Sequence, residues 1–214
     1  MTVEIILTIV RGARWTLALT ITSLAFGVLV GALLCAMRVS GSKLLNAVAV
    51  VLILTFRSVP PIVWLFLIFF GVGSSLVQIG PFLAASIGLA LITGANLGEI
   101  FRGALAAIHP GQWEAVRALG IPPIDAFLDV IGPQLIRVAL PSVATYSIGL
   151  LKDSAVASVI GVQDLAFEAS HVSQRTFRGL EVFAVAGAVY ILISLPIAWA
   201  ARVIDLHLRS KVAT

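Results

Sequence analysis

The sequence predicts an all-α integral membrane protein with about five transmembrane helices. Of its 214 residues, 60% are hydrophobic and only 11% are charged, against about 25% charged in an ordinary soluble domain. A transmembrane helix needs about 20 consecutive apolar residues, and lipid offers no hydrogen bonds to the backbone, so each apolar stretch should be helical. Five such stretches leave no room for a soluble catalytic domain, and residues 1–214 are expected to form a single transmembrane domain.

The predicted spans are 15–37, 45–70, 82–108, 141–161 and 182–202. The first is uncharged from Trp15 to Met37, which is longer than the apolar core of a cleavable signal peptide. The second is interrupted by Arg57-Ser58-Val59-Pro60-Pro61, because a residue before proline is disfavoured in helical geometry. We expect a half-helix to start near Ser58–Pro60, with Ser58 as its cap and its positive dipole end in the membrane.

The third span is followed by a polar loop, 109–140. Gln112 to Leu119 should form a short helix, with Gly120 at its left-handed C-terminal position and Pro122-Pro123 stopping it. A second short helix is expected over 124–131, ending near Pro133-Gln134, and Pro141 should open the fourth span. Between the last two spans, residues around His171 are expected to form a solvated outward loop.

Basic residues set the orientation, because cytoplasmic loops carry an excess of Lys and Arg. Around the first span the basic residues are equal in number on the two sides, so this span alone does not set the orientation. With the N-terminus outside, the cytoplasmic side receives eight basic residues and the outside keeps Arg11, Arg14, Arg175 and Arg178. The sequence therefore predicts N-out and C-in, which places 109–140 in the cytoplasm.

The helix over 112–119 has features of a docking surface. Ala115 and Ala118 are small, so a partner's groove can approach the backbone, while Trp113 and Leu119 offer anchors. An amphipathic helix lying on the lipid surface is the alternative, but that would favour a face rich in Lys and Arg. The candidate coupling residues are Gly111, Gln112, Glu114, Ala115, Arg117, Ala118, Leu119 and Gly120.

Three charged residues are expected at membrane depth: Arg57, Lys152 and Asp153. Each costs about 2.5–3.5 kcal/mol at a helix centre, so each requires a partner or water. Adjacent residues point about 100° apart on a helix, so Lys152 and Asp153 cannot pair with each other, and Arg57 is the candidate partner of Asp153. The charges could form a structural network or line a substrate path, since transporters use broken helices to hold anionic groups.

These patterns resemble the permeases of ABC importers. Gly111-Gln112-Trp113-Glu114-Ala115-Val116-Arg117-Ala118-Leu119-Gly120, followed by Val130-Ile131-Gly132-Pro133-Gln134, is similar to their EAA loop, G-Q-x-E-A-A-x-A-L-G then I-x-L-P-Q. The departures are Val116 for the second Ala and Gly132 for Leu. The resemblance implies a type I importer permease fold in a bacterial inner membrane, with the EAA helix docking on an ATPase.

Further motifs narrow the resemblance to the polar amino-acid (histidine/glutamine) permeases. Arg57-Ser58-Val59-Pro60 is similar to their R-G-T-P motif. The segment Leu150–Val156 is similar to their L-L-K-D-T-S-L motif, and the segment Glu99–Gly103 is similar to E-x-x-R-G. Asn96 stands where a Tyr is usual. The resemblance implies a polar amino acid or derivative as substrate, with an opine possible because the departures cluster near the path. The candidate path residues are Arg57, Ser58, Pro60, Asn96, Lys152 and Asp153, and Glu99 and Arg102 should form a structural pair.

The same resemblance implies the partners. An ATPase dimer would hold ATP and Mg²⁺, so this chain would be no enzyme and carry no cofactor. A second, like permease and a periplasmic or lipid-anchored solute-binding protein would complete the importer, and no nucleic acid is involved. No phosphate loop of the form G-x-x-x-x-G-K-[ST] is present, and the three scattered histidines predict no metal site.

Other interpretations remain open. An ion-coupled secondary transporter would favour an inverted repeat, which is not evident. A permease for a different small solute, or a membrane anchor without transport, would share the same composition. The small-residue pairs Gly27/Gly31 and Gly94/Gly98 could pack within the chain or against another subunit. Cys35, the one cysteine, is expected to serve packing.

Overall fold

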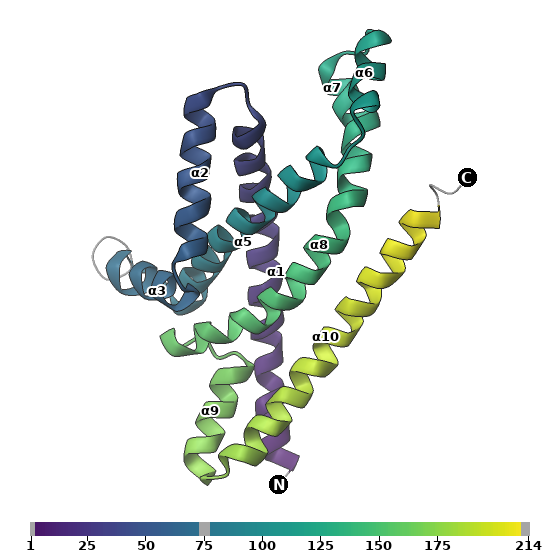
Figure 1. Cartoon of the computed structure of the whole chain (residues 1–214). Coiled ribbons are helices and arrows are strands. Elements are labelled where there is room, and N and C mark those ends of the chain that lie inside the picture. Colours follow the sequence, from purple (N-terminus) through teal and green to yellow (C-terminus); the bar gives the residue numbers. More distant parts are fainter. Residues whose placement is uncertain (1–2, 73–77, 211–214) are drawn as a thin grey trace.

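The structure, a computed structural model, describes residues 3–72 and 78–210, which are almost entirely helical (Figure 1). In chain order the elements are α1 (Val3–Val39), α2 (Lys43–Ser58), α3 (Pro61–Phe66), the π-helical η1 (Leu67–Val72), α5 (Pro81–Ala106), α6 (Pro110–Ala118), α7 (Pro123–Asp125), the π-helical η2 (Ala126–Ile131), α8 (Gly132–Asp153), the 3₁₀ segment η3 (Ser154–Ile160), α9 (Leu165–Thr176) and α10 (Gly179–Ser210). Four helical runs among the described residues are long and apolar enough to cross a membrane, and a bent pair makes up to five.

Helix α1 is longer than predicted: it begins at Val3 rather than near residue 15. Arg11 and Arg14 therefore lie within the helix, not ahead of it. Both are exposed, so they extend the helix beyond the apolar stretch at little desolvation cost. The third and fifth predicted spans correspond to α5 and α10, and α10 also continues past its predicted end, to Ser210.

Helices α1 and α5 form the centre of the bundle, and their four paired glycines let the two backbones approach. A Cβ on Gly27 would lie 2.3 Å from Thr93 Cγ2, and one on Gly94 would lie 2.4 Å from Val30 Cγ1. Gly31 and Gly98 lie against each other in the same way. Both small-residue pairs are thus occupied inside this chain, and the alternative of a subunit interface at these positions is wrong.

The second predicted span is not one straight crossing. Helices α2 and α3 meet at a bend of 102°, so that α3 runs sideways at about mid-height of the bundle (Figure 1). Pro61 occupies the first turn of α3 as expected, but Ser58 is the last residue of α2 and caps nothing in α3. The predicted cap is wrong because Val59 and Pro60 take extended conformations, which move Ser58 away from the α3 start.

The loop between α5 and α8 is more helical than predicted. A helical run continues from Pro123 to Ile160, so the expected stop near Pro133 and the expected span start at Pro141 are both wrong. Pro133 lies in the first turn of α8, directly after the π-helical η2. Pro141 lies inside α8, and the Thr145 hydroxyl donates to its carbonyl oxygen at 3.0 Å.

The segment after η3 is a helix, α9, and not a solvated loop. Asp164 caps it: its Oδ1 accepts from the Phe167 N–H at 2.8 Å, and its side chain is fully buried against α1. A Cβ on Gly12 would lie 2.6 Å from the Asp164 carbonyl oxygen, so α1 needs glycine there. Burial raises the pKa of Asp164 to about 7. The sequence missed this element because its buried face, Leu165, Ala169 and Val172, is narrow.

Candidate coupling surface and translocation path

Helix α6 has well-formed ends. Pro110 occupies its first turn, and His109 caps it, with Nδ1 accepting from the Gly111 N–H at 3.1 Å. His109 is exposed, and its ring also serves the helix end. Gly120 has φ +65°, the left-handed conformation that follows a helix end and that glycine adopts without strain. Both ends of α6 are thus fixed by local sequence.

Most of α6 is free of contacts within the chain. Its one buried residue is Val116, whereas Glu114, Ala115, Arg117 and Ala118 are exposed. Trp113 is 37% exposed and Leu119 is 75% exposed, so both anchors are available to a partner. A cavity of about 410 Å³ adjoins the helix, lined by Trp113, Val116, Arg117, Ile121, Pro123, Ala126 and Phe127. The α6 surface projects at one end of the molecule, together with α7 (Figure 1).

Two glutamines connect this surface to the bundle. Gln134 Nε2 donates to Gln112 Oε1 at 3.0 Å and to the Val130 carbonyl oxygen at 2.9 Å. Gln112, in the first half of the EAA-like pattern, and Gln134, in the second half, therefore form a brace between α6 and α8. The sequence reasoning missed this contact. Gly132, the departure from that pattern, has a local reason: a Cβ there would lie 2.6 Å from the Phe127 carbonyl oxygen.

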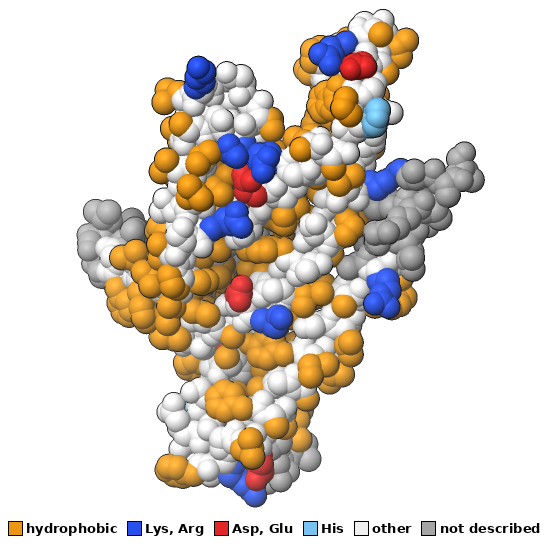
Figure 2. Space-filling model, in the orientation of Figure 1, with side chains coloured by type: hydrophobic (Ala, Val, Ile, Leu, Met, Phe, Trp, Pro, Cys, Tyr) orange, Lys and Arg blue, Asp and Glu red, His pale blue; other side chains and the backbone are white. Residues whose placement is uncertain are grey.

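The three intramembrane charges do not pair as predicted. Arg57, Lys152 and Asp153 are all exposed on the chain, and the described residues contain no ion pair between Arg57 and Asp153. The predicted pair is wrong because α2, which carries Arg57, packs on α1 and α5 rather than on α8, which carries Asp153. Figure 2 shows isolated acidic and basic side chains about halfway between the two ends of the molecule, surrounded by apolar ones.

A tyrosine on α8 bonds to α5 and lies within electrostatic range of Asp153 and Arg57. The Tyr146 hydroxyl donates to Thr93 Oγ1 at 3.3 Å, and Asn96 lies nearby, with its Nδ2 donating to the Ile92 carbonyl oxygen at 2.9 Å. Both the Asp153 and the Arg57 charges act on this hydroxyl. Tyr146 and Thr93 were missed from the sequence, since a single Tyr and Thr in apolar helices have many structural uses. Together these side chains form a polar patch on α2, α5 and α8.

Lys152 lies on a different face. It lines a cavity of about 280 Å³ between α8 and α10, with Tyr190 and Ser194 as its polar neighbours there. The 100° offset between adjacent helical residues therefore separates Lys152 from Asp153, as the spacing predicted. Pro60 lies at the α2–α3 bend, ahead of the α3 start, and contributes geometry rather than a charge.

Glu99 and Arg102 form the expected ion pair, with Oε2 2.8 Å from Nη2. A third member was missed: Arg38 on α1 places its Nε 3.1 Å from Glu99 Oε1. Arg38 also donates to Asn46 Oδ1 on α2. The Glu99 carboxylate thus connects α5 to α1, and Arg38 extends the network to α2, at the end of the bundle that carries α6.

Comparison with known proteins agrees with this arrangement. The family described as "binding-protein-dependent transport system inner membrane component" matches residues 23–210. The glutamine transport system permease protein GlnP of Escherichia coli K12 is 31% identical over 94% of this chain and 93% of its own length. The arginine ABC transporter permease protein ArtQ of Haemophilus influenzae is 33% identical over 86% and 85%.

Solved structures show the same fold. The crystal structure of an amino acid ABC transporter with histidines superposes with a TM-score of 0.85 and 33% identity, over 94% of both chains. The MetNI methionine ABC transporter, at 24% identity and a TM-score of 0.80, shows the fold alone. With the family match covering most of the chain, this protein belongs to the inner-membrane components of binding-protein-dependent transport systems and has the type I ABC-importer permease fold.

Proposed function

We propose that this chain forms the translocation path of an ATP-driven importer for a polar amino acid or a derivative of one. The relatives carry glutamine and arginine in their names, and the superposed structure is that of an amino acid transporter. The polar patch suits such a cargo, because an amino acid presents an α-carboxylate and an α-ammonium group to Arg57 and Asp153. An opine or another derivative remains within this chemistry.

One observation carries the proposal: a single helical run connects the exposed coupling surface to the intramembrane charges. It begins at Pro123, beside α6, and continues past Asp153 to Ile160. At 1.5 Å per residue, 38 residues extend about 57 Å. The Gln112–Gln134 brace holds α6 against this run, so displacement of α6 is transmitted along α8 to the polar patch.

The proposal extends to the partners, which the family membership supports. The exposed α6 residues, Glu114 and Leu119 among them, dock into a groove on an ATPase, and two ATPases bind ATP and Mg²⁺ between them. A second permease, identical or similar, completes the path, because the polar patch of one chain is open on one side. An external binding protein delivers the cargo to the end that carries α9. Closure of the ATPase pair then shifts the permeases between inward-open and outward-open states.

Reconstitution tests the proposal. The permease is placed in vesicles with its ATPase and its solute-binding protein, and ATP hydrolysis and uptake are measured with a panel of amino acids and opines. We expect one polar amino acid or derivative to stimulate hydrolysis and to accumulate. Stimulation by methionine or a sugar alone would contradict the cargo class. Uptake that follows an imposed ion gradient without the ATPase would favour a secondary transporter and overturn the proposal.

A further inference from the structure

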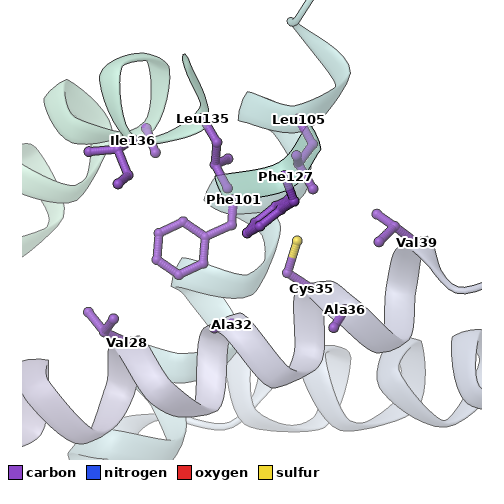
Figure 3. Close-up of a pocket in the computed structure, with 11 residues that line it drawn as sticks. Val28, Ala32, Cys35, Ala36, Val39, Phe101, Leu105, Phe127, Leu135 and Ile136 are labelled. Atoms are coloured by element: carbon purple, nitrogen blue, oxygen red, sulfur yellow. The ribbon is translucent and has the colours of Figure 1, made fainter. Parts of the chain in front are cut away.

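Helix α1 has different surroundings along its two halves. Its C-terminal half borders an open apolar groove of about 320 Å³, to which Val28, Cys35 and Phe101 contribute (Figure 3). Its N-terminal half packs against α9 and α10 around an apolar core that includes Ile9 and Leu165. Three polar side chains meet beside this core, one from each element: Thr16 of α1, Asp164 at the start of α9 and Tyr190 of α10.

The polar atoms of this cluster are only partly satisfied. Asp164 Oδ1 accepts from the Phe167 N–H at 2.8 Å, and Thr16 Oγ1 accepts from the Leu165 N–H at 3.1 Å. The second bond holds the first turn of α9 against α1. Asp164 Oδ2 and the Tyr190 hydroxyl are both buried and have no hydrogen-bond partner among the described residues. Because a buried polar atom without a partner is costly, the cluster favours a proton on Oδ2 that these two groups can share.

The helices around Asp164 offer no positive charge to its carboxyl among the described residues. The charge that acts on it is negative and comes from Glu168, on α9 itself. Burial, with a smaller contribution from Glu168, raises the pKa of Asp164 to about 7. The other charged or titratable side chains near this end are exposed: Glu4, Arg11 and Arg14 on α1, His171 and Arg175 on α9, and Arg178 and Glu181 at the start of α10.

The proton on Asp164 decides whether the start of α9 can stay docked. A neutral carboxyl can remain buried beside Tyr190, whereas an ionised one without a counter-ion needs water. Water is excluded while the backbones are in contact, since a Cβ on Gly12 would lie 2.6 Å from the Asp164 carbonyl oxygen. We propose that Asp164, Thr16 and Tyr190 form a proton-operated latch, which holds α9 on α1 and α10 while Asp164 is protonated and releases it when the proton passes to external water.

This latch would make transport depend on external pH. It rests on the proposed function, which takes the end that carries α9 as the external one and requires the permease to open there. Release of α9 from α1 removes contacts that hold this end closed, so the outward-open state becomes more populated as the external pH rises through about 7. The latch is separate from the polar patch and from α6, and it acts on the rate of opening rather than on the choice of cargo.

Cysteine labelling in the permease–ATPase complex measures the latch directly. In a Cys35→Ala background, Ala169→Cys places a thiol on the buried face of α9, and Gln174→Cys places one on its exposed face as the control. A membrane-impermeant maleimide is added outside at pH 6, 7 and 8, and the rate for the buried position is divided by the rate for the exposed one. We expect this ratio to rise about tenfold from pH 6 to pH 8, as the ionised fraction of a group with a pKa of about 7 does.

Two further variants test the cause. Asp164→Asn keeps a capping side chain but has no proton to release, so its labelling ratio should stay low at every pH. Glu168→Gln retains Asp164 and removes a charge that opposes its ionisation, so the rise should move to lower pH. A ratio independent of pH with Asp164 present, an equal rise in Asp164→Asn, or a shift to higher pH in Glu168→Gln would overturn the proposal.

Uptake into vesicles with the interior held at pH 7 provides a second readout. The wild-type rate divided by the Asp164→Asn rate should rise severalfold between external pH 6 and pH 8, and the division removes any pH dependence of the solute-binding protein. A constant quotient would overturn the proposal. Failure of the proposed function would look different: neither protein would show ATP-driven uptake at any pH, while the labelling ratio would still rise and support the latch.

Discussion

Arg38 on α1 and Glu99 on α5, 61 residues apart in the sequence, form an ion pair with Nε 3.1 Å from Oε1. Both side chains are about one-fifth exposed, and the same Glu99 binds Arg102. Because Arg38 also reaches Asn46, this carboxylate ties α1 and α2 to the end of α5 that leads into α6.

Removal of Arg38 should therefore loosen the cytoplasmic end of the bundle. Arg38→Ala leaves one side of Glu99 without its charged partner, at a cost of about 1.5–3 kcal/mol, and should lower the thermal unfolding midpoint. Arg11→Ala, on an exposed part of the same helix, is the control and should change the midpoint little. Arg38→Lys, which keeps a positive charge beside Glu99, should recover part of the loss; a Lys variant no more stable than the Ala variant would mean that the charge contact is incidental.

The left-handed conformation of Gly120 predicts a graded effect on coupling. Gly120→Val should cost about 1–2 kcal/mol in backbone strain and misplace the end of α6, so ATPase binding and uptake should fall while the permease level stays normal. Gly120→Asn tolerates this conformation and should retain most of both. Glu114→Ala, which removes an exposed charge, should reduce ATPase co-purification in the same assay. Normal uptake in Gly120→Val and Glu114→Ala together would refute docking through α6.

The glycine contacts of α5 predict opposite outcomes for two substitutions in one helix. Gly94→Ala puts a Cβ 2.4 Å from Val30 Cγ1, so α1 and α5 must separate, and stability should fall by about 1–3 kcal/mol. Gly103→Ala meets nothing within 4 Å and should be neutral or stabilising by up to about 1 kcal/mol, through helix propensity. Thermal unfolding of the two purified variants distinguishes them. Equal losses would mean that close approach is not the cause.

Asp164 predicts a pH dependence of stability. Its folded pKa of about 7 lies above the ordinary value of 3.8, so between these two values the folded protein keeps a proton that the unfolded chain releases. Its contribution is therefore most favourable below about pH 4 and is lost as the pH rises to 7, by up to about 4 kcal/mol. Above pH 7 the loss is complete.

Asp164→Asn retains a capping side chain and removes this titration, so unfolding midpoints between pH 5 and pH 8 should differ less than in the wild type. Asp125→Asn, an exposed carboxylate on α7, is the control and should leave the pH profile unchanged. A wild-type profile that is flat across this range, or one that Asp164→Asn leaves unaltered, would show that the buried carboxyl does not titrate there.

The polar patch predicts additive effects of Arg57 and Asp153. Since the two side chains form no ion pair, Arg57→Ala and Asp153→Ala should each give normal abundance and a raised KM for uptake. Tyr146→Phe, which removes the hydroxyl bonded to Thr93, should raise KM more modestly. The double variant Arg57→Ala with Asp153→Ala should show the product of the single effects. Restored abundance in the double variant, relative to either single one, would point to a pair formed in the assembled transporter.

The sequence by itself determined the features that depend on neighbours in the chain. Apolar length fixed the existence of the helices, because lipid permits no other spanning structure for these segments. Pro60-Pro61 fixed the break in the second span, and Gly120 fixed the end of α6, because both act through their own backbone conformations. The separation of Lys152 from Asp153 followed from helical geometry alone.

Tertiary structure decided which groups meet. Pro141 stays inside α8, although local rules made it a helix start, because bundle packing outweighs the cost of one lost backbone bond. Glu99 pairs with Arg38, which lies 61 residues earlier in the sequence. Arg57 and Asp153, which were predicted to pair because of their opposite charges, form no ion pair in the described residues. Asp164 is buried only because Gly12 lets α1 approach its carbonyl. The charge of a residue and its position along a helix predict that it needs a polar partner. Which partner lies within reach is set by the packing of whole helices.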